Sequence, residues 1–391
     1  MRPDELAKLD DRWSMHNYRR APVEFVEGSG ARLIDSEGGE YLDFLTGIAV
    51  CSLGHCHPDV VAAVEDQAGR LMHVSNLFLS EPAVHLAKAL SESSLGGAAF
   101  LCNSGAEANE AAIKIARKAA HRRGVGAPEI VVLEGGFHGR TMGAVSASPK
   151  MTADPAFGPY LEGFVTVSRN DADALGDAVN DRTAGILIEP VQGEAGIFPI
   201  DEDFLRKARE EADRTRAALI FDEVQSGMGR TGRLWAHQWS GVEPDLMTTA
   251  KALGGGFPVG ACVASESWAE VFEPGDHGST FAGGPMASRA ALTALEVTSN
   301  PALLAAVEEK GNRLIVGLEG LEGFSEVRGR GLMVGADLAS GEGAPELVER
   351  LLERGLVANA TGPATLRLLP PLVVTDSEID RALEMISSSL D

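Results

Sequence analysis

The feature that most constrains the fold is a repeated alternation of short β-rich runs with helical stretches between about residues 95 and 265. Two of the intervening stretches, 106–121 and 203–217, have the spacing and charge pattern of surface-packed helices. Strands that alternate with helices favour a mostly parallel sheet with helices on both faces, which is an α/β fold. The expected strands are 98–102, 130–134, 164–167, 185–189, 218–222 and 245–249.

The two ends of the chain have a different pattern of expected strands and helices from this central part. Residues 1–45 and 296–391 combine short strands with amphipathic helices, and 329–335 and 366–374 are strand candidates. A chain of 391 residues is long enough for two or three domains. We therefore expect a large domain over 46–295 and a smaller α+β domain formed by both ends together.

Charge and composition exclude several classes of partner. The formal net charge of −23 would repel nucleic acid and anionic membrane surfaces over most of the exterior. The four cysteines form no CxxC pair, so a disulfide framework is not expected. The first residues lack the apolar stretch of a signal peptide. We expect a cytoplasmic protein with no nucleic-acid or membrane partner.

Small residues follow the first expected strand, where ligands bind in open α/β sheets. Asn103, Ser104, Gly105 and Ala106 lead directly into a helix. Free backbone N–H groups at a helix start suit a phosphate group. Ser104 is also an ideal N-cap, and this structural interpretation is favoured when the turn is considered alone.

Two charged residues follow later strands of the same expected sheet. Asp222 ends the run 218–222, where a carboxylate can pair with a protonated ring nitrogen, although a helix cap or a salt bridge is the simpler interpretation. Lys251 follows the run 245–249 and precedes three glycines. In such apolar surroundings the pKa of a lysine falls, and its amine can form a Schiff base.

Two motifs suggest other chemistry. The stretch 227–232 (GMGRTG) fits the dinucleotide pattern G-x-G-x-x-G, but no clean helix follows it. The triplet 55–57 (HCH) has metal-ligating residue types, but no distant second pair would complete a tetrahedral set. We therefore expect no metal site.

Set in order, these stretches resemble the class III, ω-amino-acid family of fold type I aminotransferases, from about residue 22 to the C-terminus. The resemblance implies the fold type I architecture, pyridoxal 5'-phosphate as the cofactor, and a homodimer with shared active sites. The matching motifs are SLGHCHP, HVSNLF, NSGAEANEAAIKIAR, FHGR, IEPVQGEAGI, FDEVQSGMGRTG, AKALGGGFPVGA, HGSTFAGGP and RGRGLMVG.

The resemblance also implies the cofactor contacts. Lys251 would hold the cofactor and move a proton, and Asp222 would face the pyridine nitrogen. The other expected contacts are Phe137 and Val224 at the ring faces, Gln225 at the phenolic oxygen, Glu223 beside it, and Ser104, Gly105 and Ala106 at the phosphate, joined by Thr280 of the other subunit.

Substrate contacts follow by the same resemblance, because planar arginines suit the two carboxylates of glutamate. Arg140 would bind the distal carboxylate of glutamate or the α-carboxylate of the amine substrate, and Arg367 the α-carboxylate of glutamate. Glu194 would pair with Arg367 when the terminal-amine substrate has no carboxylate there and would swing aside for glutamate, and Ser279 would contact the amine substrate.

The implied reaction moves the terminal amino group of N2-acetylornithine to 2-oxoglutarate, giving N-acetylglutamate 5-semialdehyde and glutamate. Other amines remain open, namely succinylornithine, succinyl-diaminopimelate, ornithine, 4-aminobutyrate and carrier-linked lysine. More distant alternatives are a nicotinamide-dependent dehydrogenase and a non-catalytic descendant of the fold. The stretch 281–285 (FAGGP) departs from the family's frequent Tyr-Gly-Gly-Asn-Pro and puts local packing in question.

Overall fold

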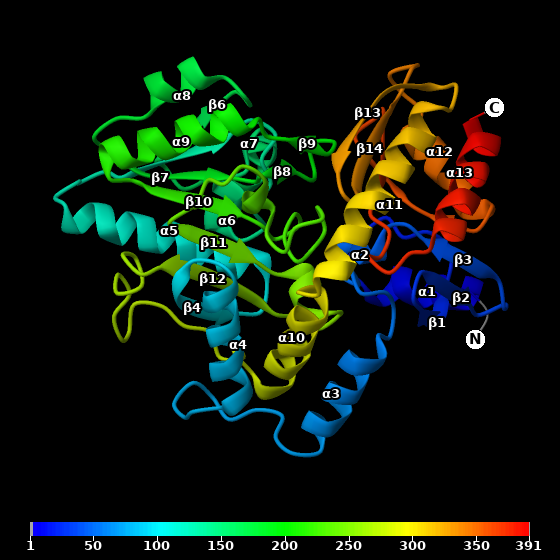
Figure 1. Ribbon diagram of the computed structural model, residues 1–391, viewed down its shortest axis with the longest axis horizontal. Coiled ribbons are helices and arrows are strands. Elements are labelled where there is room, and N and C mark those ends of the chain that lie inside the picture. Colours follow the sequence, from blue (N-terminus) through cyan, green and yellow to red (C-terminus); the bar gives the residue numbers. More distant parts are fainter. Residues whose placement is uncertain (1–2, 391) are drawn as a thin grey trace.

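The computed structural model describes residues 3–390, which form two bodies of different architecture (Figure 1). The larger body surrounds a seven-stranded sheet in the order β4-β12-β11-β10-β7-β5-β6. All its neighbouring pairs are parallel except those of β12, so the predicted α/β class is confirmed. The strands are β4 (Gly96–Cys102), β5 (Glu129–Leu133), β6 (Phe164–Val167), β7 (Thr183–Ile188), β10 (Ala218–Asp222), β11 (Leu246–Thr249) and β12 (Gly260–Ser265).

The six strands predicted from the alternation are present, but β12 was not predicted. Its sequence, GACVAS, consists of small residues without the alternation of a half-buried strand. Close packing requires the glycine at its start, because a Cβ at Gly260 would lie 2.7 Å from the carbonyl oxygen of Ser104. Tertiary contacts therefore select this strand, and sequence periodicity does not reveal it.

Side chains of the central strands alternate between two helical layers. In β5, Ile130 and Val132 pack toward α5 (Gly105–Arg122), whereas Val131 and Leu133 pack toward α9 (Glu202–Thr215). Figure 1 shows α5 and α9 on opposite sides of β7 and β10. The near-continuous apolar runs of these strands follow from burial on both faces.

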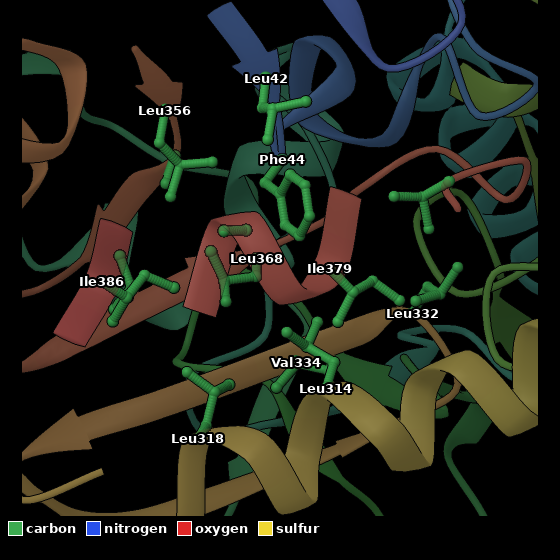
Figure 2. Packing of buried hydrophobic residues seen from close by; sticks show 14 of the residues in the cluster. Leu42, Phe44, Leu314, Leu318, Leu332, Val334, Leu356, Leu368, Ile379 and Ile386 are labelled. Carbon is green, nitrogen blue, oxygen red and sulfur yellow. The ribbon is translucent and has the colours of Figure 1, made fainter. Parts of the chain in front are cut away.

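The smaller body joins the two ends of the chain. β3 (Glu40–Asp43) pairs in parallel with β15 (Leu356–Val357), so the N-terminal strands and a C-terminal strand share one sheet. A second sheet has the order β13-β14-β17-β16. Figure 2 shows the shared core, in which Leu42 and Phe44 meet apolar residues from the C-terminal region, among them Leu314.

The remaining elements cover and connect these sheets. The strands are β1 (Phe25–Ser29), β2 (Arg32–Asp35), β8 (Val191–Gln192), β9 (Phe198–Pro199), β13 (Phe324–Arg330), β14 (Met333–Leu338), β16 (Asn359–Thr361) and β17 (Thr365–Leu368). The α-helices are α1 (Pro3–Trp13), α2 (Thr46–Ala49), α3 (Pro58–Ala68), α4 (Glu81–Ser93), α6 (Met142–Ser146), α7 (Pro149–Thr152), α8 (Ala172–Ala178), α10 (Pro285–Thr298), α11 (Pro301–Glu319), α12 (Ala344–Glu353) and α13 (Asp376–Leu390). Short 3₁₀ turns cover Pro155–Phe157, Ala236–Trp239 and Lys251–Gly254.

Two strand predictions in the C-terminal region were wrong in extent. The stretch 329–335 contains the turn between β13 and β14, where Gly331 adopts a positive φ of 55°. The stretch 366–374 leaves the sheet after Leu368, because Pro370 and Pro371 have no N–H for a ladder. For the domain division, we propose that the large domain extends to the end of α10, beyond the predicted boundary at 295.

Among the described residues, no single helix is long and apolar enough to cross a membrane. α10 and α11 together pass that test of length and composition, but they are bent by 70° at the break between them.

Replacing Leu314 by alanine should lower the free energy of unfolding by about 2–5 kcal/mol, because this fully buried side chain would leave a cavity. Val316→Ala is the matched control on the same helix, where the side chain is 66% exposed. The control should change stability by no more than about 0.5 kcal/mol. Chemical denaturation measures both variants, and equal losses would contradict the described core.

Candidate active site

A pocket of about 410 Å³ lies where the strands of the large sheet end. Its walls include segments that follow five strands, β4, β5, β7, β10 and β11. The volume lies within the roughly 300–1,000 Å³ that is typical of ligand pockets. The predicted site residues that line it are Ser104, Gly105, Ala106, Phe137, Glu194, Asp222, Val224, Gln225 and Lys251.

The start of α5 combines a helix cap with an anion-binding geometry. The Ser104 hydroxyl accepts a hydrogen bond from the Glu107 amide at 3.2 Å, so the simpler N-cap interpretation holds. Gly105 and Ala106 nevertheless line the pocket at the positive end of an 18-residue helix. A Cβ at Gly105 would lie 2.7 Å from Val224 Cγ1, so glycine leaves the backbone approachable.

Asp222 is a buried carboxylate held by a network of donors. Its Oδ2 accepts from Asn109 Nδ2 at 2.7 Å and from His138 Nδ1 at 2.8 Å, and its Oδ1 accepts from the Val224 amide at 3.0 Å. Asn109 Oδ1 in turn accepts from the Thr248 hydroxyl at 2.8 Å. Burial acts to lower the pKa of His138, but the hydrogen bond and charge of Asp222 outweigh it and raise that pKa. Both oxygens of the buried Asp222 carboxylate therefore have hydrogen-bond donors.

A second buried carboxylate, Glu189, lies on the same wall. It accepts from the Phe137 amide at 2.7 Å and from the Gly193 amide at 3.0 Å. Burial raises the pKa of Glu189 to about 7, against the opposing effect of nearby His138. Sequence reasoning missed Asn109, His138 and Glu189, although each falls within a motif already noted.

Lys251 enters the pocket directly after β11. Its backbone has a φ of 45°, a left-handed conformation that is uncommon for a residue with a side chain. Burial lowers the pKa of the Lys251 amine, and the negative charge of Glu194 partly opposes that shift. A lowered pKa leaves more of the amine neutral, which is the nucleophilic form.

Arg367 of β17 forms an ion pair with Glu194 at the rim of this pocket. The Arg367 side chain is only 1% exposed, and its Nη1 lies 2.5 Å from Glu194 Oε1. Arg367 also donates to the Gly193 carbonyl at 3.1 Å and to Asn359 Oδ1 at 3.0 Å. Gln225 Nε2 donates to the same Glu194 oxygen at 3.2 Å. The pair thus joins the small body to the pocket wall.

Four other predicted residues lie outside the pocket wall. The Glu223 carboxylate turns away and accepts from the amides of Ala236 and His237 at 2.5 and 2.9 Å. The Arg140 side chain is exposed, with its guanidinium 5.7 Å from the Phe137 ring centroid. The remaining two, Ser279 and Thr280, lie between β12 and α10. Ser279 Oγ accepts from Asn103 Nδ2 and donates to Glu107 Oε1, and Thr280 is exposed in the single chain.

The pocket suits a flat, phosphorylated, cationic ring such as pyridoxal 5'-phosphate. Its apolar walls include Phe137 and Val224, and the helix start offers an anion site. Asp222 supplies a carboxylate for a ring nitrogen, and Lys251 supplies an amine for an aldehyde. No other described lysine lines this pocket.

The two motifs that suggested other chemistry have structural roles. In the 227–232 turn, buried Arg230 donates to the Leu332 carbonyl at 3.0 Å and to Ser52 Oγ at 2.7 Å, so it links the two bodies. His55 forms an ion pair with Asp43 at 2.6 Å. Over residues 3–390, no group of three or more His, Cys, Asp or Glu side chains could hold a metal ion.

Glu189→Gln should remove one source of pH dependence in stability. Because the pKa of Glu189 is about 7 against an ordinary 4.5, the folded protein holds a proton that the unfolded chain releases between these values, so wild-type stability falls as pH rises through this window. The unfolding free energy of wild type minus that of the variant should fall by about 1–3 kcal/mol between about pH 5 and pH 7.5. Urea denaturation at both pH values measures this difference in unfolding free energy, and a difference that stays constant with pH would contradict the prediction.

Comparison with known proteins assigns the family. The model of the family Aminotransferase class-III matches residues 14–390. Acetylornithine aminotransferases from Caldanaerobacter subterraneus subsp. tengcongensis and Methanocaldococcus jannaschii are each 46% identical to the chain. The alignments cover 98% of this chain and 99% of the first relative, and 99% of this chain and 98% of the second.

Solved structures agree with that assignment. An ornithine aminotransferase from Toxoplasma gondii, with partial occupancy of PLP at its active site, has a TM-score of 0.94 and 34% identity, covering 99% of this chain and 94% of the other. N-acetylornithine aminotransferase from Stenotrophomonas maltophilia K279a has a TM-score of 0.84 and 38% identity, covering 98% of this chain and 97% of the other. The pocket chemistry and both comparisons agree: the chain belongs to the class-III aminotransferase family and is a pyridoxal-phosphate-dependent transaminase.

Proposed function

We propose that this transaminase moves the terminal amino group of N2-acetylornithine to 2-oxoglutarate, giving N-acetylglutamate 5-semialdehyde and glutamate, as a step of arginine biosynthesis. The observation that carries the proposal is near-complete alignment with acetylornithine aminotransferases at 46% identity. Ornithine is the second candidate amine, because the Toxoplasma gondii ornithine aminotransferase superposes with a TM-score of 0.94. Its lower identity of 34% ranks it behind N2-acetylornithine.

Residues of the pocket would hold the cofactor in complementary ways. The amides of Gly105 and Ala106 would bind the phosphate, and the Asp222 carboxylate would hold the ring nitrogen in its protonated form. Phe137 and Val224 would enclose the ring, with Gln225 at its edge. Bound there, pyridoxal phosphate supplies an aldehyde that bonds the substrate amine and a ring that withdraws electrons from the substrate carbon.

Lys251 is the proposed catalytic base. Its neutral amine, favoured by burial, can bond the cofactor covalently and, when released, accept a proton from the substrate carbon and return one. Asp222 would hold the ring nitrogen through a carboxylate that Asn109, His138 and the Val224 amide keep in place. Exclusion of water by the enclosing apolar walls strengthens both electrostatic effects.

Carboxylate recognition would distinguish the two substrates. Arg367 would bind the α-carboxylate of glutamate after Glu194 leaves it, and Arg140 would bind a second carboxylate farther out. With Glu194 in place, the positive charge of Arg367 is already satisfied, which suits a terminal amine that carries no carboxylate there. Ser279 is a further proposed contact to the amine substrate.

The proposed assembly is a homodimer in the cytoplasm. Large apolar side chains are exposed on the loop after α3, in α4 and in the 279–282 segment. Asn76 Nδ2 of that loop donates to the Ser279 and Ala282 carbonyls at 3.2 and 3.0 Å, which ties the loop to the 279–282 segment. Contiguous exposed apolar surface marks interfaces. We propose that it meets a second copy and directs Thr280 toward that copy's phosphate site. The exposed apolar side chains of this proposed interface are Leu71, Met72, Leu77, Phe78, Leu79, Val84 and Phe281.

The visible absorption spectrum during stepwise substrate addition tests the function. N2-acetylornithine added alone should bleach the yellow band of the cofactor-loaded protein, and 2-oxoglutarate should restore it. Lys251→Ala should keep its fold by circular dichroism but lose turnover by a factor of about 10²–10⁴ or more.

A yellow band that N2-acetylornithine leaves unchanged but ornithine bleaches would move the assignment to the second candidate. Near-normal turnover of Lys251→Ala would remove that lysine from its proposed role. Asp173, on the exposed surface of α8, offers a control substitution to alanine that should leave the spectrum unchanged.

Phe281→Asp should weaken the proposed dimer, because a buried unpaired carboxylate in an apolar interface is costly. We expect the wild-type protein to sediment as a dimer and the variant to shift toward monomer at micromolar concentration. Phe157→Asp is the control, since this side chain is exposed at 67%, similar to the 69% of Phe281, but lies outside the proposed surface. A monomeric wild-type protein with full activity would contradict the assembly.

A further inference from the structure

The residue that pairs with Arg367 lies on a short hairpin between the two bodies. β8 and β9 form this hairpin, and Glu194 lies in the turn that joins them. Figure 1 shows β8 and β9 in the gap between the large sheet and β13. Because Glu194 is carried by a turn and not by a long strand, its position depends on what holds the hairpin.

An aromatic ring on this hairpin is held by two arginines. The guanidinium carbon of Arg169, in the loop after β6, lies 3.8 Å from the centroid of the Phe198 ring. That of Arg328, in β13, lies 3.9 Å from the same centroid. Two groups so close to one centroid cannot share a face without overlap, so they lie on opposite faces. We call Arg169, Phe198 and Arg328 the arginine clamp.

Each arginine also fixes the hairpin backbone or its buried side chain. Arg328 Nε donates to the Gly196 carbonyl at 2.9 Å, two residues after Glu194. Arg169 Nη1 donates to Gln192 Oε1 at 2.8 Å, two residues before it. Both ends of the turn that carries Glu194 are therefore anchored, one to the large body and the other to the small body.

The position of Arg328 is itself fixed by a carboxylate. Its Nη1 and Nη2 donate to the two oxygens of Asp337 at 2.7 and 2.9 Å, and Thr365 Oγ1 donates to Asp337 at 2.5 Å. Bidentate pairing fixes the plane of a guanidinium. The side chain of Arg328 is only 9% exposed, so solvent screens this arrangement weakly. The guanidinium of Arg328 in the arginine clamp is therefore held in one orientation, unlike that of an exposed surface arginine.

We propose that Arg328 and Phe198 are positioning residues for Glu194, and that the arginine clamp sets how readily Arg367 is released to a substrate carboxylate. This inference rests on the proposed role of Glu194 as a displaceable partner of Arg367. A firmly held hairpin keeps the Glu194–Arg367 pair formed and favours the terminal amine. A loosened hairpin releases Arg367 and favours a dicarboxylate.

Binding of glutarate to the cofactor-loaded protein tests the clamp without any turnover. Glutarate has two carboxylates but no amine or keto group, so it must take Arg367 from Glu194 without reacting. In Arg328→Met, we expect the glutarate Kd measured by calorimetry to fall by about fivefold or more. The ratio of glutamate to N2-acetylornithine half-reaction rates, followed by stopped-flow absorbance, should rise by a similar factor.

Two further variants separate positioning from general destabilisation. Phe198→Leu removes the shared ring but leaves the Arg328–Asp337 pair intact, and it should move both readouts in the same direction. Arg313→Met removes a paired arginine elsewhere in the small body, where Arg313 Nη2 lies 2.6 Å from Asp380, and both readouts should stay at wild-type values. Thermal unfolding of all three variants identifies any that fail to fold.

A Kd and a rate ratio that stay at wild-type values in both Arg328→Met and Phe198→Leu would overturn the clamp, even if both variants were less stable. If the wild-type protein failed to react with N2-acetylornithine, the proposed substrate would fall. The glutarate Kd would still decide the clamp, because that measurement does not depend on which amine reacts.

Discussion

The buried carboxylate of Asp222 is the constraint on which the site depends. A carboxyl group is expensive to bury unless hydrogen-bond partners surround it, and this one has three donors. Those donors come from α5, from the loop after β5 and from the turn after β10, so satisfying one charge requires several crossover connections to converge. Asn109 extends the same network to Thr248 in β11, three residues before Lys251. The charge therefore specifies the geometry of the sheet edge.

Contacts between the two bodies form the second layer of organisation. Arg230 reaches from the large body to the Leu332 carbonyl, and Arg367 reaches back from the small body to Glu194. Arg328 and Arg169 hold the intervening hairpin from its two sides. Arginine suits all these positions, because its planar group can donate to several acceptors at once while remaining charged. The pocket is consequently completed by residues far apart in sequence.

The sheet was largely predictable, because its central strands are buried on both faces and carry long apolar runs. β12 was not, since its small residues are selected by close approach to β4 and leave no period. The pocket-wall position of Lys251 follows from its place after a strand, which sequence spacing can detect. His138 and Glu189 were missed, because nothing local distinguishes a histidine that bonds Asp222, or a buried carboxylate that accepts two backbone amides, from an ordinary polar loop residue.

By itself, the sequence determined the α/β class, the order of the central strands along the chain, and the residues that follow them, because period and burial pattern are local properties. The long motifs likewise identified the family. Only the tertiary structure decided that Glu223 turns away from the pocket, that Phe198 lies between Arg169 and Arg328, and that β3 joins β15. Side-chain direction and pairing between distant segments depend on packing and on the satisfaction of buried charges, which no local pattern encodes.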